Sequence, residues 1–164
     1  MMFLALAVLL AGPAEVPKAK PGEIAPTFSL PASNGKTISL GEFKGRKQVV
    51  LAFFPKAFTG ACTKEMGAFR DHQEAFDEKN AQILAISMDD LDTQTKFAAS
   101  LKLTFPVLAD KGGKVASAYG VKGLLWANRT TFVIDTEGKI TAVFDGKDAI
   151  DPAVTLAACQ RKAP

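Results

Sequence analysis

An uninterrupted apolar run, QVVLAFF from Gln48 to Phe54, restricts the fold of this chain more than any other feature. A strand without polar alternation is typical of a parallel or mixed sheet that is covered on both faces. After Thr59 the period changes, because the apolar residues from Cys62 to Phe76 recur at helical spacing. The pattern predicts a buried strand followed by a helix that packs on the sheet.

Strands and helices alternate along the rest of the chain. Two short segments around Asn34 and Gly35 alternate apolar and polar residues, which indicates a hairpin. Further strands are expected at 82–87, 105–109, 131–135 and 140–144, and helices at 91–103, at 112–119 and after Pro152. This order predicts the α/β class with a thioredoxin-like fold: a mixed central sheet flanked by helices, with an N-terminal β-hairpin extension.

The length and the first residues suggest the domain organisation. A chain of 164 residues with 48% hydrophobic residues fits one domain. Residues 1–11 are all apolar and small residues follow, so we expect a signal peptide at 1–14, a linker at 15–22 and the domain at 23–164. Such a leader predicts a periplasmic or secreted location, with a cytoplasmic one as the alternative. It is shorter than the ~20 residues of a transmembrane helix, so no stable membrane insertion is expected.

Charge and residue counts exclude several functions. The net charge is +3 and the basic residues are scattered, which argues against nucleic acid as a partner. Two cysteines and one histidine are too few for a structural metal site without carboxylates, so we expect no structural metal. We expect no organic cofactor either. His72 follows Cys62 by ten residues on the predicted helix, about 15 Å along its axis. It cannot be the base of a cysteine hydrolase.

Cys62 is the strongest candidate for chemistry. The segment PKAFTGAC, from Pro55 to Cys62, joins the end of the buried strand to the start of the helix. Unpaired N–H groups and the positive end of the helix dipole favour a thiolate there. The alternative is a small buried residue without chemical function. Glu65 stands three positions later, so the C-x-x-C pair of thioredoxins is absent.

These segments resemble a known family. PKAFTGACTKE is similar to the peroxiredoxin motif P-x-x-x-T-x-x-C, and RTTFVID at 129–135 resembles the strand that carries the family's active-site arginine. The segments AFRD, KFA, FPVLAD and AYGV resemble the bacterioferritin-comigratory, or Q-type, subfamily of these alkyl hydroperoxide reductase and thiol-specific antioxidant proteins. The resemblance runs from about Pro21 to the end.

The resemblance implies a role for each matching residue. Cys62 would be the peroxidatic nucleophile, Thr59 would orient the peroxide, Pro55 would shield the site from water, and Arg129 would be the cation. Glu65 would either hold Arg129 or only favour the helix dipole. Three phenylalanines would either wall the pocket or fill the core: Phe53, Phe54 and Phe58.

The resemblance also implies the substrates and leaves the second thiol open. Many Q-type relatives carry a resolving cysteine five positions after the peroxidatic one, where this chain has Gly67. Cys159 is the only other thiol and a candidate resolving residue, while Trp126 is either a substrate or partner contact or core filling. We expect a one-cysteine peroxidase, monomer or homodimer, that reduces hydrogen peroxide and small organic hydroperoxides through a Cys62 sulfenic acid. Its reductant would be thioredoxin or another external thiol.

Two other functions stay open. One is an exported thioredoxin-like thiol-disulfide oxidoreductase, against which the absence of C-x-x-C counts. The other is a redox-inactive thioredoxin-fold module that binds partners. An ordinary buried thiol at Cys62 would favour the latter.

Overall fold

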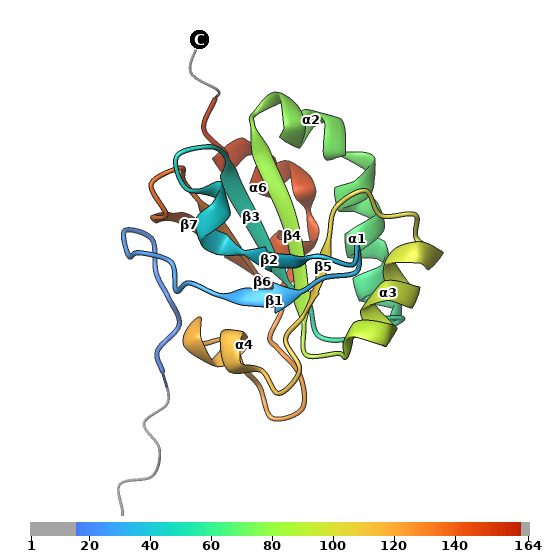
Figure 1. The fold of residues 1–164 in the computed structure, drawn as a ribbon. Helices are drawn as coiled ribbons and strands as arrows, with labels where there is room; N and C mark the ends of the chain where they lie inside the picture. The colour runs from blue at the N-terminus through green and yellow to red at the C-terminus, as the bar shows by residue number, and fades with distance from the viewer. Residues whose placement is uncertain (1–15, 162–164) are drawn as a thin grey trace, which may run out of the picture.

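The computed structural model describes residues 16–161, which form a mixed five-stranded sheet with helices and a separate two-stranded hairpin packed around it (Figure 1). The strands are β1 (Ser29–Pro31), β2 (Thr37–Ser39), β3 (Gln48–Phe53), β4 (Ala81–Ser87), β5 (Val107–Ala109), β6 (Thr130–Ile134) and β7 (Ile140–Asp145). The helices are the 3-10 helix η1 (Leu40–Phe43), α1 (Gly60–Asp71), α2 (Gln73–Glu78), α3 (Leu91–Ser100), α4 (Lys114–Ala118), α5 (Gly146–Ile150) and α6 (Pro152–Ala158). The predicted fold class is confirmed.

β3 occupies the centre of the sheet, whose strand order is β5-β4-β3-β6-β7. It pairs in parallel with β4 and antiparallel with β6, and each of its residues is buried. This burial explains its uninterrupted apolar sequence. Phe53 at the end of β3 pairs with Thr130 at the start of β6. Arg129 therefore lies at the same end of the sheet as the loop that follows β3.

Two hydrophobic cores lie on the two faces of the sheet. Helices α1, α2, α3 and α6 contribute to the core that contains Cys62 and Phe97. The hairpin of β1 and β2, together with η1 and α4, contributes to the other core, which contains Phe53 and Tyr119. Cys62 thus lies in the helical layer on one side of β3.

The helices differ from the prediction in four places, one of which is α4, expected at 112–119 and observed at Lys114–Ala118. The helix expected to continue to Phe76 breaks at His72, whose N–H bonds to carbonyls of the preceding turn, and α2 begins at the next residue. The helix expected at 91–103 ends at Ser100, and Lys102 then adopts a positive φ of 51°. Helix α5 was not predicted. None of these changes moves the start of α1.

Residues 16–22, which fall in the predicted linker, run along the domain. Ala19 N donates to Tyr119 O, and Gly22 N donates to Ile140 O. Gly120 has a φ of 67°, and a Cβ there would lie 2.5 Å from the backbone of Lys18. This close approach needs a glycine. The predicted signal peptide at 1–14 lies outside the described residues.

Between residues 16 and 161, no helix combines the length and the apolar character needed to cross a bilayer.

Candidate active site

Cys62 lies in the first turn of α1, directly after the loop that leaves β3. Thr59 precedes the helix with extended backbone angles, and Cys62 is the third helical residue. The Cys62 side chain is buried, with 1% of its surface exposed. Its position combines two properties: the backbone N–H groups of a helix start and a surrounding that contains little water.

Arg129 reaches Cys62 from the start of β6. Its Nη2 donates to Cys62 Sγ at 3.2 Å, and its Nη1 donates to Glu65 Oε2. Glu65 stands one turn after Cys62 on α1, so the two atoms that accept from Arg129 belong to one helix face. One planar guanidinium therefore bridges a thiol and a carboxylate, which a single lysine ammonium could not do in the same geometry.

The ion pair of Arg129 and Glu65 is almost fully removed from water. The side chain of Arg129 is 13% exposed and that of Glu65 is 0% exposed. Glu65 Oε1 has no hydrogen-bond partner among the described residues. Burying a charged pair costs desolvation energy and is weak evidence for stability, whereas leaving one member alone is strongly unfavourable. This pair therefore fixes the guanidinium at the sulfur more than it stabilises the fold.

Thr59 and Pro55 lie in the same loop but do not join these contacts. Thr59 Oγ1 donates to Lys56 O at 2.8 Å, and this bond closes a turn within the loop. No hydrogen bond connects the Thr59 hydroxyl to Cys62 or Arg129 in residues 16–161. Pro55 is half-buried and lines a hollow beside the loop. Both residues are near the start of α1 without touching the sulfur through a hydrogen bond.

The three phenylalanines considered for the pocket wall lie in three different surroundings. Phe53 packs against Tyr119, with ring centroids 5.4 Å apart, on the face of the sheet opposite Cys62. Phe54 is buried on the Cys62 side and packs against Phe97. Phe58 is 56% exposed, and its ring lies 5.2 Å from that of Phe97. Phe53 and Phe54 are therefore core, whereas the ring of Phe58 is largely exposed.

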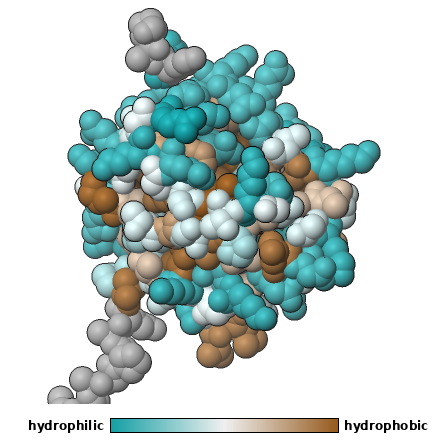
Figure 2. Space-filling model, in the orientation of Figure 1, coloured by the Kyte–Doolittle hydropathy of each residue, from teal (hydrophilic) through white to brown (hydrophobic). Residues whose placement is uncertain are grey.

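Trp126 does not fill the core, because 47% of its surface is exposed. It lines the hollow together with Pro55, Met88 and Asp89. Its neighbour Leu124 is 96% exposed. These residues belong to the loop after α4, where hydrophobic atoms project at the lower edge of the molecule (Figure 2). This exposure contradicts core filling for Trp126, while a contact with a substrate or partner stays a prediction.

Cys159 is buried at the end of α6, far from Cys62. The backbone of Gln160 forms two hydrogen bonds with the side chain of Gln48, the first residue of β3, whereas Cys62 follows the other end of that strand. The five steps of β3 span about 17 Å at ~3.3 Å per residue. A disulfide requires Cα atoms within about 7 Å. The two cysteines, both free here, cannot pair without local unfolding.

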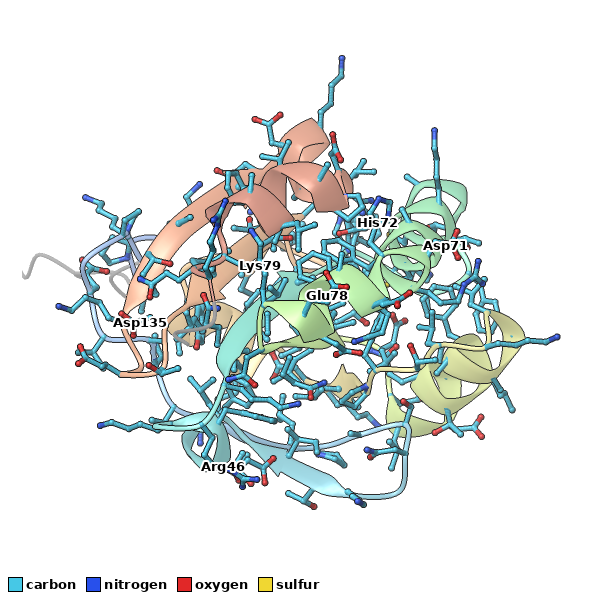
Figure 3. All side chains as sticks on the ribbon, turned by 90° about the horizontal axis from the view of Figure 1, so that it is seen from above. Arg46, Asp71, His72, Glu78, Lys79 and Asp135 are labelled. Atoms are coloured by element: carbon cyan, nitrogen blue, oxygen red, sulfur yellow. The ribbon has the colours of Figure 1, made fainter. Side chains whose placement is uncertain are left out.

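Burial also lowers the reactivity of Cys159. It raises the pKa of this thiol to about 11, although the Lys79 ammonium acts in the opposite direction. Lys79 lies where α2 ends, below the C-terminal helix in the view of Figure 3, and its Nζ donates to Leu156 O and Cys159 O. The thiolate that would attack a sulfenic acid is therefore scarce at neutral pH.

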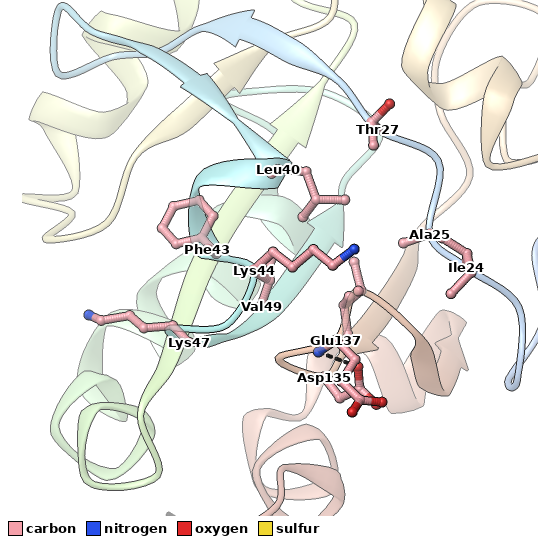
Figure 4. Close-up of a pocket in the computed structure, with 13 residues that line it drawn as sticks. Ile24, Ala25, Thr27, Leu40, Phe43, Lys44, Lys47, Val49, Asp135 and Glu137 are labelled. Atoms are coloured by element: carbon pink, nitrogen blue, oxygen red, sulfur yellow. Dashed lines mark hydrogen bonds between the residues drawn. The ribbon is translucent and has the colours of Figure 1, made fainter.

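Another pocket lies at the opposite end of the sheet from Cys62 (Figure 4). Val49 at the start of β3 and Ile134 at the end of β6 contribute to its floor, and Lys44 and Glu137 stand at its rim. No residue predicted for the active site lines it.

Over residues 16–161 the structure contains no group of three or more His, Cys, Asp or Glu side chains able to hold a metal.

One contact of the active-site loop was not predicted from the sequence. Ala57 N donates to Asp89 Oδ2, which belongs to the segment after β4. A single aspartate after a strand has no motif spacing that marks it, so the sequence contains no signal that could have identified it.

Comparisons with known proteins agree on one family. A model of the AhpC/TSA family matches residues 21–143. Peroxiredoxin Q of Triticum aestivum, named as chloroplastic, is 38% identical over 133 residues, which are 79% of this chain and 61% of that protein. A putative peroxiredoxin bcp of Coxiella burnetii is 39% identical over 131 residues, covering 75% of this chain and 86% of that one. The chain thus spans about 61% of the plant relative's length.

Solved structures show the same relationship. Peroxidoxin BcpB from Mycobacterium tuberculosis superimposes with a TM-score of 0.81 at 37% identity, covering 85% of this chain and 96% of that one. A mutant of peroxiredoxin Q from Xanthomonas campestris gives a TM-score of 0.75 at 28% identity, with 80% and 88% covered.

Proposed function

The chain belongs to the AhpC/TSA family, and we propose that it is a thiol-dependent peroxidase whose nucleophile is Cys62. The observation that carries the proposal is the hydrogen bond from Arg129 Nη2 to Cys62 Sγ at the start of α1. A cation and a helix N-terminus at one sulfur favour the thiolate, which is the form that attacks a peroxide. The alternative of an inert buried thiol would leave room for the pairing of Arg129 with Glu65 but does not account for the second guanidinium N–H at the sulfur.

The reaction proceeds in two balanced steps. The Cys62 thiolate attacks the terminal oxygen of a hydroperoxide, so the S–O bond forms while the O–O bond breaks. The sulfur loses two electrons and becomes a sulfenic acid, and the departing oxygen takes up a proton to give water or an alcohol. Two equivalents of an external thiol then return Cys62 to the thiol, releasing a disulfide and water.

Arg129 has the geometry to stabilise both ends of this transition. Its Nη2 already contacts the sulfur, and the remaining N–H groups of the fork can approach the oxygen that gains negative charge as the O–O bond breaks. Glu65 holds the guanidinium through Nη1. The Thr59 hydroxyl hydrogen-bonds to the peroxide oxygen once it no longer donates to Lys56 O. Pro55 limits the access of water from the hollow that it lines.

The reductant is an external thiol, thioredoxin or another donor. Gly67 stands where a nearby thiol would resolve the sulfenic acid, and Cys159 lies at the other end of β3. The exposed tip of Leu124, Leu125 and Trp126, beside Pro55, offers an apolar contact surface for such a donor.

A periplasmic or secreted location is part of this proposal and rests on residues 1–14. N-terminal sequencing of exported protein would test it.

Trapping the intermediate tests the proposal. One equivalent of hydrogen peroxide followed by dimedone should give an adduct at Cys62 by intact mass and peptide mapping, and excess peroxide should give the sulfinic acid. Cys62→Ser should consume no peroxide with dithiothreitol, whereas Cys159→Ser should keep most of the turnover. Retained turnover in Cys62→Ser would refute the function. A Cys62 to Cys159 disulfide that forms faster than the adduct would refute the one-cysteine mechanism.

A further inference from the structure

A chain of hydrogen bonds connects α3 to the loop in front of Cys62. Gln94 on α3 is fully buried, and its Nε2 donates to Ser87 Oγ at 2.7 Å. Ser87 Oγ donates to Asp89 Oδ2 at 2.6 Å. The same Oδ2 accepts the backbone N–H of Ala57 at 2.9 Å. Three side chains outside the predicted motif thus form a series of hydrogen bonds whose last member binds one backbone amide of the active-site loop.

The loop needs such a contact, because its backbone is strained next to the point of attachment. Phe58 follows Ala57 and has a φ of 63°, a region that bulky residues rarely adopt. Strained residues persist only where the surrounding structure holds them. Phe58 is largely exposed and its ring leans on Phe97 of α3. The buried hydrogen bond of Ala57 therefore restrains the loop immediately before Thr59 begins the approach to α1.

On the basis of the proposed peroxidase function, we propose that Asp89 is a positioning residue for Cys62. Its carboxylate holds the amide of Ala57, and through the loop from Ala57 to Thr59 it sets the start of α1 against Arg129. Within residues 16–161 Asp89 forms no hydrogen bond with the sulfur and no ion pair with Arg129, so we expect it to act through the backbone. Small displacements matter here, because the hydrogen bond of 3.2 Å between Arg129 and the sulfur depends on where the first turn of α1 lies.

The adjacent Asp90 provides a matched control. Its side chain accepts from Thr93 N and caps α3, and it makes no contact with the loop. Removing a cap typically costs about 1 kcal/mol of helix stability, so Asp90→Ala reports what weakening the start of α3 does by itself. Asp89→Ala and Asp90→Ala therefore remove the same group from neighbouring positions, one attached to the loop and one to the helix.

The experiment measures the rate of Cys62 oxidation by hydrogen peroxide and the hydrogen exchange of the Ala57 amide. Asp89→Ala should slow oxidation about tenfold to a hundredfold and accelerate exchange of that amide by a similar factor, since a hydrogen bond to a charged acceptor is lost. Asp89→Asn keeps an acceptor oxygen and should stay within about threefold of the wild type in both. Asp90→Ala should lower thermal stability and leave both rates unchanged.

Two outcomes would overturn the inference. One is unchanged oxidation in Asp89→Ala, whether or not the amide exchanges faster. The other is an equal loss of rate in Asp90→Ala, which would mean that general destabilisation is the cause. If Asp89→Ala does not fold, Ser87→Ala takes its place, because it removes the hydroxyl bound to the carboxylate. A wild type that peroxide does not oxidise would instead refute the peroxidase function, while the exchange of Ala57 still decides whether Asp89 holds the loop.

Discussion

Replacing Arg129 by glutamine should have two effects that a second substitution can separate. The change leaves Glu65 buried without a cation, and Oε1 already lacks a partner. Breaking one side of a buried pair costs about 3 to 5 kcal/mol. The same change removes the donor at Cys62 Sγ, which should slow oxidation by about 10² to 10³. Arg129→Gln alone therefore loses both stability and rate.

The double variant Arg129→Gln with Glu65→Gln removes the uncompensated charge but not the catalytic deficit. We expect it to recover most of the unfolding free energy, because no uncompensated charge is then left in the buried site. Its oxidation rate should stay low. Urea unfolding followed by circular dichroism gives the first quantity, and peroxide consumption under single-turnover conditions gives the second. Recovery of the rate in the double variant, or unchanged stability in the single one, would refute this account.

Two further predictions concern Cys159 and Gly120. The free energy of unfolding should fall as the pH rises from about 9 to about 11, because burial raises the pKa of Cys159 from its ordinary 9.0 to about 11. In that range the thiol ionises in the unfolded chain before it does in the folded one. Urea unfolding should show a smaller decline for Cys159→Ser. Gly120→Ala should lose more stability in thermal unfolding than Gly45→Ala, since both glycines have positive φ but only the former meets the backbone of Lys18; equal losses would contradict this.

The sequence predicted the central strand better than the ends of helices. β3 was expected at 48–54 and ends only one residue earlier, at Phe53. The agreement is close because an apolar run between turn residues indicates both ends of a buried strand. The break at His72 and the end of α3 at Ser100 carry no glycine or proline at the boundary itself. Tertiary packing rather than local propensity determines where those helices stop.

In the candidate site, too, some features were predicted from the sequence and others were not. The position of Cys62 at a helix start follows from periodicity alone, and the meeting of Cys62 with Arg129 was implied only by the family resemblance. The contact of Asp89 with Ala57 depends on the parallel pairing of β3 and β4, which aligns the loops after both strands. No local pattern encodes that register. The face on which Phe53 lies could likewise not be read from a run in which every residue is apolar.

Gly67 is a position of α1 at which the fold does not require a glycine. A Cβ at this position would meet only Arg70 Nη2, at 3.8 Å, and the glycine has no positive φ. A glycine inside a helix is less favourable than alanine by about 1 kcal/mol, so a small side chain at this position would not destabilise the helix. Cysteine can therefore be gained or lost at this helix position at little cost to the fold. On the proposed mechanism, a single substitution of Gly67 by cysteine would place a second thiol five positions after Cys62, on the helix that carries it.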